Sequence, residues 1–221
     1  MSNNKKVIIN TEVTGFSPKD GHKLVEIAAI EIDENDIQTG AVFHVYINPE
    51  RRIPKEVTAI HGLDYKFLKN FPTFAAYKDE FLRFIEGKEI IGHNVHFDMD
   101  FINNELGFEL PNKVTDTLEM ARELFPAQRN NLTALSERLN AKIKHSPYNG
   151  ALLDALYAYE IYKRLKMGKI KFDIAGWKEK LLNGADINKP DETGHTALEQ
   201  AVCANSIRGI NNRVDKPKIM K

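Results

Sequence analysis

INTEVTGFSPKDGHKLVEIAAIEI, residues 9–32, is the stretch of this chain that decides its fold. It begins at the end of a Val-Ile-Ile run at 7–9, and so short and wholly apolar a run predicts a strand buried on both faces. Glycines and a proline between residues 15 and 21 indicate a loop. Residues 24–32 predict a second strand, and the short connection makes the two strands antiparallel neighbours.

Strand and helix patterns follow as far as about residue 165. Residues 41–47 predict a third strand, and residues 89–91 predict a short strand that ends at a glycine. Helical periodicity, caps and chain breakers predict five helices, at 73–86, 97–106, 117–125, 131–139 and 150–165. We therefore predict an α/β fold, a mixed sheet with helices on its faces.

Size and composition set limits on the function. A length of 221 residues suggests one domain with an appendage, or two small domains. The 31 basic and 31 acidic residues cancel, so a nucleic-acid partner would need a local site and not a global positive field. We expect a cytoplasmic protein without membrane association, because no membrane-spanning run or secretory signal is visible and Cys203 is the single cysteine.

The character of the sequence changes towards the C-terminus. Gly168 and the lysines around it predict a junction between a domain at 1–168 and a small α-helical tail at 169–221. The stretch LLNGADINKPDETGHTALEQAV (181–202) resembles part of an ankyrin repeat, and a plain helical hairpin is the alternative. One repeat does not bury its own apolar face, so the tail would pack on the main domain, bind a protein partner or be a remnant.

Four polar residues are candidates for chemistry. Asn10 and Glu12 follow the first apolar strand, where ligand sites gather in α/β sheets, although taken alone they are ordinary strand-end residues. Asp98 and Asp154 each lie on an apolar face of a predicted helix. A carboxylate there needs a partner, because an unpaired buried charge is expensive. A metal ion or a buried Arg or Lys would serve, and periodicity does not choose between them.

Two further carboxylates have structural interpretations. Glu26 lies between apolar neighbours, and we expect it to accept a hydrogen bond from the backbone. Asp116, followed three residues later by Glu119, predicts a helix N-cap.

Three motifs resemble those of DnaQ-like exonucleases. Residues 9–32 resemble the first motif, which is a strand with Asp-x-Glu, a Thr-Gly loop and a second strand containing Glu-Ile. HNVHFDMDFINNEL (93–106) resembles the second, and NGALLDALYAYEIY (149–162) resembles the third, written His-Gly-Ala-x-x-Asp. Residues 61–74 and 116–126 also resemble the proofreading subunit of bacterial replicative polymerases.

The resemblance implies a ribonuclease H-like sheet and two divalent cations, Mg²⁺ or Mn²⁺. Such ions prefer carboxylate ligands, and a pair of them can clamp both the attacking and the leaving oxygen of a phosphodiester. A histidine near its working pKa would deprotonate the water. The implied substrate is the 3′ end of a nucleic acid, with single-stranded DNA preferred over RNA.

Two positions depart from the family motifs. Glu12, Asp98 and Asp154 match three of its four metal-binding carboxylates, whereas Asn10 stands where the family has Asp. One lost charge at ~4 Å is worth up to about 4 kcal/mol, or roughly a thousandfold in metal occupancy. Asn149 stands where the family has its catalytic His, and losing a general base costs about 10²–10⁴ in rate.

The remaining site residues are expected from the same resemblance. His145, four residues before the asparagine at the base position, is the candidate substitute base. Phe16 would wedge against the terminal base and Phe97 would stack on a base face, with simple core packing as the alternative for both. Polar contacts with the terminal nucleotide are expected from Thr11, Thr14, Gly15, His61 and Asn94.

Three functions remain open on the sequence. The first is an attenuated two-metal 3′→5′ exonuclease. The second is an inactive relative that binds nucleic-acid ends or a protein, and the third is an interaction protein that recruits a partner through its tail.

Overall fold

The computed structural model describes residues 5–141, 143 and 150–182, of which 169–182 are described by their backbone alone. The chain divides into two compact units, Met1–Lys166 and Met167–Lys221. The ankyrin-like stretch lies outside the described residues, apart from the helical backbone of its first two positions. The domain boundary at residue 168 and the nature of the tail stay predictions.

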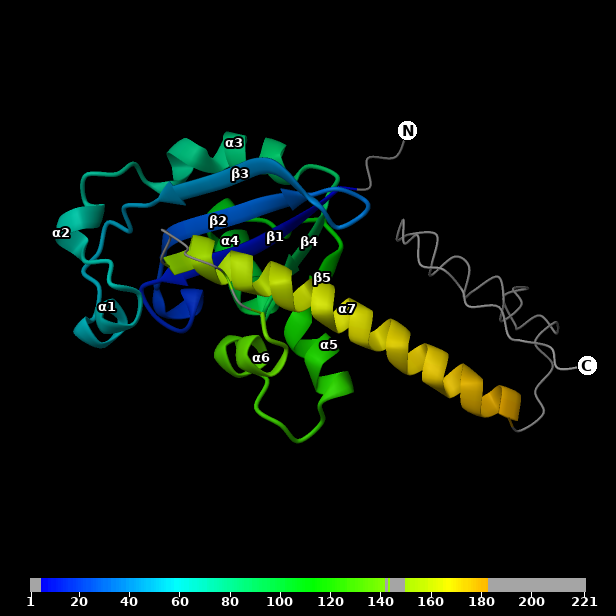
Figure 1. Ribbon diagram of the computed structural model, residues 1–221. Helices are drawn as coiled ribbons and strands as arrows, with labels where there is room; N and C mark the ends of the chain where they lie inside the picture. Colours follow the sequence, from blue (N-terminus) through cyan, green and yellow to red (C-terminus); the bar gives the residue numbers. More distant parts are fainter. Residues whose placement is uncertain (1–4, 142, 144–149, 183–221) are drawn as a thin grey trace, which may run out of the picture. The chain divides into compact units, whose positions relative to one another are not determined.

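A five-stranded mixed sheet forms the centre of the first unit (Figure 1). Its strand order is β3-β2-β1-β4-β5. The β3–β2 and β2–β1 pairs are antiparallel, and the β1–β4 and β4–β5 pairs are parallel. The strands are β1 (Lys6–Val13), β2 (Leu24–Ile32), β3 (Gln38–Tyr46), β4 (Glu89–Gly92) and β5 (Val114–Asp116).

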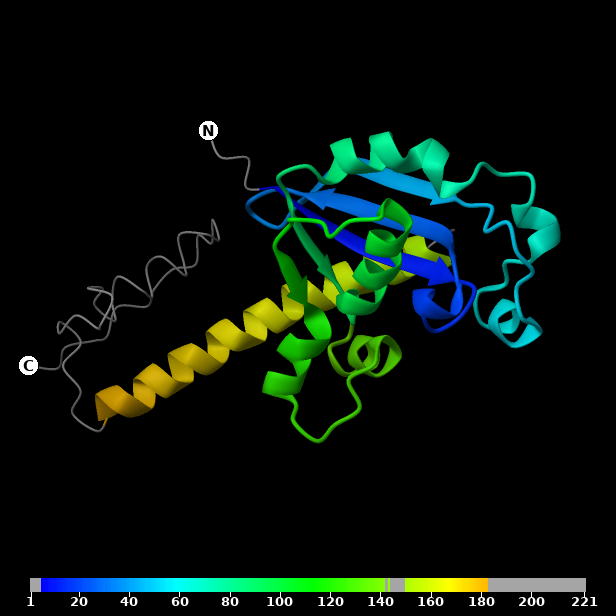
Figure 2. The same cartoon turned by 180° about the vertical axis from the view of Figure 1, so that it is seen from behind.

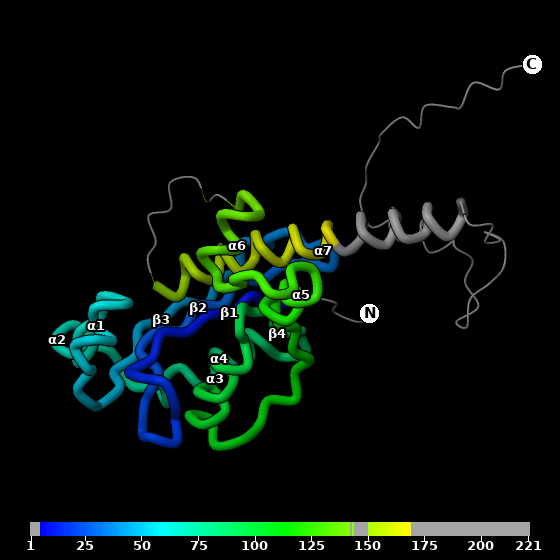
Figure 3. Tube along the Cα trace, turned by 90° about the horizontal axis from the view of Figure 1, so that it is seen from below, coloured from blue at the N-terminus to red at the C-terminus, as the bar shows by residue number. Residues whose placement is uncertain are grey.

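Helices cover both faces of this sheet. The helices are η1 (Pro18–Asp20), α1 (Lys55–His61), α2 (Tyr65–Leu68), α3 (Phe74–Ile85), α4 (Val95–Leu106), α5 (Thr117–Leu124), α6 (Leu132–Arg138) and α7 (Gly150–Leu182). Viewed from below, α3 and α4 lie on one side of the strands and the first half of α7 lies on the other (Figure 3). The reverse view shows α4 in front of β1 (Figure 2).

Alternation along β1 explains these two layers. Val7 and Ile9 are fully buried in the cluster that contains α3 and α4, whereas Ile8 is fully buried in the cluster that contains α7. Successive side chains of a strand point to opposite faces, so an apolar run is needed where both faces are covered. The prediction of a doubly buried first strand is therefore confirmed.

Most predicted elements are confirmed, and two differ. Asn10 and Glu12 were expected beyond the first strand, but both lie inside β1, because β2 pairs with it as far as Val13. The last helix was expected to end near residue 165 but continues through Gly168 to Leu182. One glycine costs only about 1 kcal/mol relative to alanine and does not by itself stop a helix.

The five predicted helices did not include η1, α1 or α2, and the sequence pattern did not predict the three-residue strand β5. It exists because β4 offers a parallel partner edge, from Ile90 opposite Val114 to Gly92 opposite Asp116. Among the helices of the described residues, none combines the length and the apolar character that a membrane crossing needs.

Candidate active site

Asn10 and Glu12 point to the face of the sheet that α7 covers. They share the alternation of Ile8, whose side chain packs against Ala151 and other small residues of α7. Fully buried alanines at helical spacing let the helix approach the sheet closely. Asp154 lies in the same part of α7, one turn after the helix begins, and its side chain is half-buried.

Asp98 comes from the other side of the sheet, in the first turn of α4. Its side chain is only 3% exposed. The Thr11 backbone N–H donates to Asp98 Oδ1 at 2.8 Å, and the Thr11 hydroxyl donates to the same oxygen at 2.6 Å. Thr11 therefore fixes the orientation of Asp98, and both of its donors are engaged in doing so.

The charges of Asp98 and Asp154 both act on Glu12. Burial, together with the charges of Asp154, Glu26 and Asp98, raises the pKa of Glu12 from 4.5 to about 8. Burial also raises the pKa of Asp98 from 3.8 to about 7, against the hydrogen bonds from Thr11 that lower it. Burial and the charge of Glu26 raise the pKa of Asp154.

This donor set fits a divalent cation. Carboxylates that are buried beside one another resist ionisation, and a bound Mg²⁺ or Mn²⁺ would reverse that cost while using the oxygen ligands that it prefers. Asn10 is half-buried on the same face of β1 as Glu12 and offers an uncharged amide oxygen. The metal roles of Asn10, Glu12, Asp98 and Asp154 stay predictions. Asn149 and His145 lie outside the described residues.

The Thr-Gly-Phe loop after β1 has a packed base and an exposed tip. Thr14 is fully buried, and its hydroxyl lies 3.1 Å from His22 Nδ1 and accepts from the Lys23 N–H at 3.0 Å. A Cβ on Gly15 would lie 2.2 Å from the His22 ring, so a larger residue there would displace that ring. Phe16 is 83% exposed, which excludes core packing for this side chain.

The other aromatic candidate packs differently. The Phe97 ring lies 5.2 Å from the Phe101 ring and packs against the cluster between the sheet and α3 and α4. Core packing therefore accounts for Phe97 without a ligand.

His61 lies at the end of α1 with one ring nitrogen unsatisfied. The Leu63 N–H donates to Nδ1 at 3.0 Å, so the proton of the neutral ring is on Nε2. Nε2 is buried and makes no well-formed hydrogen bond. Burial lowers the pKa of His61, and the nearby Val13 carbonyl partly offsets that decrease. The Nε2–H therefore faces the Val13 carbonyl in the interior.

Asn94 borders a pocket. It has a left-handed backbone (φ 60°), and its N–H donates to Asp116 Oδ1 at 2.8 Å. With His93 and Arg122 it lines a cavity of about 950 Å³ next to the second motif. The prediction that Asp116 caps a helix is confirmed, because Oδ1 also accepts from the Leu118 N–H at the start of α5.

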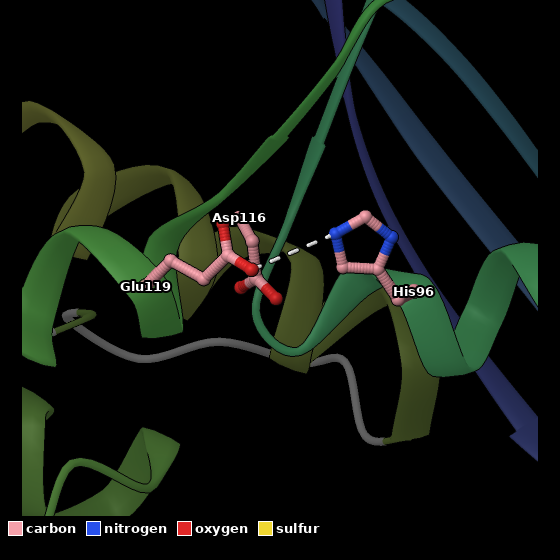
Figure 4. A group of neighbouring side chains, drawn as sticks. All are labelled: His96, Asp116 and Glu119. Atoms are coloured by element: carbon pink, nitrogen blue, oxygen red, sulfur yellow. Dashed lines mark ion pairs between the residues drawn. The ribbon is translucent and has the colours of Figure 1, made fainter.

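His96, Asp116 and Glu119 form a second group of metal-ligating types (Figure 4). Their ligand atoms lie within 4.8 Å of one another. His96 and Glu119 are largely exposed, and their closest contact is 3.9 Å. Since Asp116 already caps α5, we assign this group to a helix cap and a surface ion pair.

The backbone partner predicted for Glu26 is confirmed. Glu26 is 1% exposed, and its Oε2 accepts from the Ala151 N–H at 3.2 Å. Its Oε1 lies 2.7 Å from His44 Nε2, a contact that the sequence did not reveal. The alternation of side chains along β3 indicates that His44 and Tyr46 share one face of the sheet. It does not indicate that this face meets Glu26.

The fold and the carboxylate cluster together define a class, an α/β protein of the nuclease type. The comparisons with known proteins identify the family. Residues 7–162 match the family model RNase T, described as an exonuclease. The chain belongs to this DnaQ-like exonuclease family, whose members use divalent metals.

Its relatives and structural neighbours agree. The DNA polymerase III subunit epsilon of Rickettsia prowazekii (strain Madrid E) is 38% identical over 231 residues, covering 100% of this chain and 95% of the relative. The subunit of the same name from Escherichia coli K12 is 36% identical, covering 77% of this chain and 75% of the relative.

Solved structures share the ribonuclease H-like fold. Exonuclease X in complex with 5′ overhanging duplex DNA has a TM-score of 0.60 and 21% identity, covering 73% of this chain and 91% of that one. A product-bound exonuclease I has a TM-score of 0.64 and 19% identity, covering 84% of this chain and 49% of that one.

Proposed function

We propose that this chain is a 3′→5′ exonuclease that acts on single-stranded DNA ends and is attenuated at two positions. The observation that carries the proposal is that Asp98 on α4 and Asp154 on α7 both lie near enough to Glu12 on β1 for their charges to act on it. Glu12, Asp98 and Asp154 would hold the cations, with Asn10 as a weak, uncharged fourth ligand.

Each residue has a defined task in this proposal. When bound, the two cations supply a nucleophilic water and stabilise the leaving 3′ oxygen. Thr11 holds Asp98 in one orientation through two hydrogen bonds. Asn149 does not accept a proton at working pH, so His145 is the proposed substitute base.

The exposed residues around the cluster suit a terminal nucleotide. Phe16 stands exposed beside the buried Thr14–Gly15 turn, and stacking on an aromatic ring tolerates every base. The side chains of His93 and Asn94, which line a pocket beside the second motif, would add hydrogen bonds. We choose DNA because the relatives are DNA polymerase subunits and a structural neighbour is a DNA complex.

A protein partner is part of the proposal. The match to the Rickettsia prowazekii subunit covers all of this chain, so the tail at 169–221 has a counterpart in a protein named as a polymerase subunit. We propose that this tail binds another polymerase subunit.

A second function is favoured by a specific observation. Asn10 and Asn149 remove one ligand charge and the general base, whereas the rest of the motifs is retained. A chain that binds DNA ends without cutting them would have this pattern.

A turnover assay separates the two functions. With a 3′-labelled single strand and Mn²⁺, we expect slow release of mononucleotides that Glu12→Ala abolishes. End binding without release would favour the second function, and equal release by both chains would indicate a contaminant.

Reverting both asparagines tests the assignment of the motifs. We expect Asn10→Asp with Asn149→His to raise the rate by at least about 10³-fold, because it restores a ligand charge and a general base. An unchanged rate in a folded double variant would mean that the residues are wrongly matched to the family.

A further inference from the structure

Glu26 is a buried carboxylate that the proposed reaction does not use. It is 1% exposed, and its two oxygens contact two different elements. Oε1 lies 2.7 Å from His44 Nε2 on β3, and Oε2 accepts from the Ala151 N–H in the first turn of α7 at 3.2 Å. One side chain on β2 therefore ties the sheet to the beginning of α7.

The position of Glu26 carries an electrostatic cost. In the β1–β2 register it stands directly opposite Glu12, where like charges on one face destabilise a sheet. Its charge is also among the causes that raise the pKa of both Glu12 and Asp154. A third carboxylate at this place is expected only where its hydrogen bonds serve a purpose.

The start of α7 is shaped around this carboxylate. Gly150 has a left-handed φ of 64°, and a Cβ there would lie 2.3 Å from Glu26 Oε2. Only glycine lets the backbone come this close to the carboxylate. The Ala151 N–H is one of the groups that a helix start leaves without an intrahelical partner. Glu26 accepts its hydrogen bond, which would otherwise be missing.

We propose that Glu26, held by His44, is a positioning residue for the metal site. It fixes the first turn of α7 and thereby sets Asp154, one turn further on, against Glu12. We assign it a positioning role because its oxygens contact His44 and the Ala151 N–H on two different elements. This role rests on the proposed function, since it presumes that Glu12 and Asp154 share a cation.

Mn²⁺ binding to the full-length chain provides the test. The dissociation constant is measured by isothermal titration calorimetry, and Tm is measured on the same samples. All chains carry His96→Ala, which removes the exposed His96–Asp116–Glu119 group as a competing site. The variants are Glu26→Ala, Glu26→Gln, Glu31→Ala and Glu12→Ala.

Glu31→Ala is the matched control. Glu31 lies on the same strand, is 5% exposed and pairs with Lys88 at 2.6 Å and Lys5 at 2.9 Å. It stands opposite Val7, towards the far end of β1 from Glu12. Its removal costs stability in the same way without touching α7.

A positioning role predicts a specific pattern. Glu26→Ala weakens Mn²⁺ binding by at least about tenfold, as the loss of groups that orient ligands commonly does. Glu26→Gln restores binding to within about threefold, because the amide oxygen accepts from Ala151 and the amide N–H₂ donates to the other tautomer of His44. Glu31→Ala lowers Tm but leaves Mn²⁺ affinity within about threefold of the parent.

Every other result counts against the role. If Glu26→Ala and Glu31→Ala weaken Mn²⁺ binding equally, Glu26 contributes only to general stability. If Glu26→Gln binds Mn²⁺ as weakly as Glu26→Ala, the charge of Glu26 and not its position determines the affinity. If Glu12→Ala abolishes Mn²⁺ binding and Glu26→Ala leaves it intact, the positioning role alone is overturned. If Glu12→Ala leaves Mn²⁺ binding unchanged, both the proposed function and the positioning role are contradicted.

Discussion

Glu12 is a carboxylate whose ionisation the folded chain opposes. Burial, with Asp154, Glu26 and Asp98 nearby, raises its pKa from 4.5 to about 8. Between these two values the native state keeps a proton that the unfolded state releases. Stability of the metal-free chain therefore falls as pH rises through this window.

Replacing Glu12 by its neutral isostere tests this at the residue scale. In EDTA we expect Glu12→Gln to raise Tm by at least about 2 °C near pH 8.5 and to change it by less than about 1 °C near pH 5. Differential scanning calorimetry of parent and variant measures both shifts. A constant difference at the two pH values would mean that Glu12 titrates normally.

Cation binding should reverse the same effect. Because Mn²⁺ binds ionised carboxylates, we expect it to raise Tm of the parent more near pH 8.5 than near pH 5, and to raise Tm of Glu12→Gln less at both. If Mn²⁺ shifts Tm by the same amount at both pH values and in Glu12→Gln, the cation binds elsewhere.

At the scale of elements, α7 is held by the β2–β3 turn as well as by Glu26. The Tyr159 hydroxyl donates to the Asp36 carbonyl at 2.9 Å, and Lys166 Nζ lies 2.5 Å from Asp36 Oδ2. Lys6 on β1 pairs with the other carboxylate oxygen. These lysines hold the pKa of Asp36 below its usual value although burial alone would raise it.

Asp36→Asn isolates the contribution of this turn. Asparagine tolerates the left-handed φ of 62° at this position, so the change removes charge and little else. We expect it to lower the free energy of unfolding at pH 7 by about 1–3 kcal/mol, less than for a fully buried pair because Lys166 is partly exposed. Urea denaturation measures it.

Asp33→Asn in the same turn is the control for this substitution. Asp33 caps the Asn35 and Ile37 N–H groups, and an amide oxygen does the same, so we expect a change below about 0.5 kcal/mol. The Asp36 effect should vanish as pH falls below 3.8, because a group with a lowered pKa stabilises only when ionised. An effect that persists in acid would not come from the ion pairs.

At the scale of the whole molecule, the buried apolar clusters of the described residues all lie between residues 7 and 165. We expect a chain that ends at Gly168 to unfold cooperatively with Tm within about 4 °C of the full chain, because it keeps this core. It should also keep Mn²⁺ affinity while losing binding to a polymerase subunit. A broad transition would mean that the tail belongs to the folding unit.

Local patterns predicted much of this molecule because each depends on neighbouring residues. The apolar run before Asn10, the periodicity of α3 and the cap at Asp116 each express a local preference of backbone or side chain. β5 escaped because three residues carry too little pattern, and its partner strand lies far away in the sequence.

The sequence by itself determined the family and most of the strands and helices, and it singled out Glu12, Asp98 and Asp154 as candidate metal-binding carboxylates, because motifs and periodicity are local properties. Only the tertiary structure decided what holds them. Thr11 meets Asp98 across 87 positions, and Glu26 meets Ala151 across 125. Such contacts follow from strand register and helix packing, which join residues whose separation along the chain leaves no local signal.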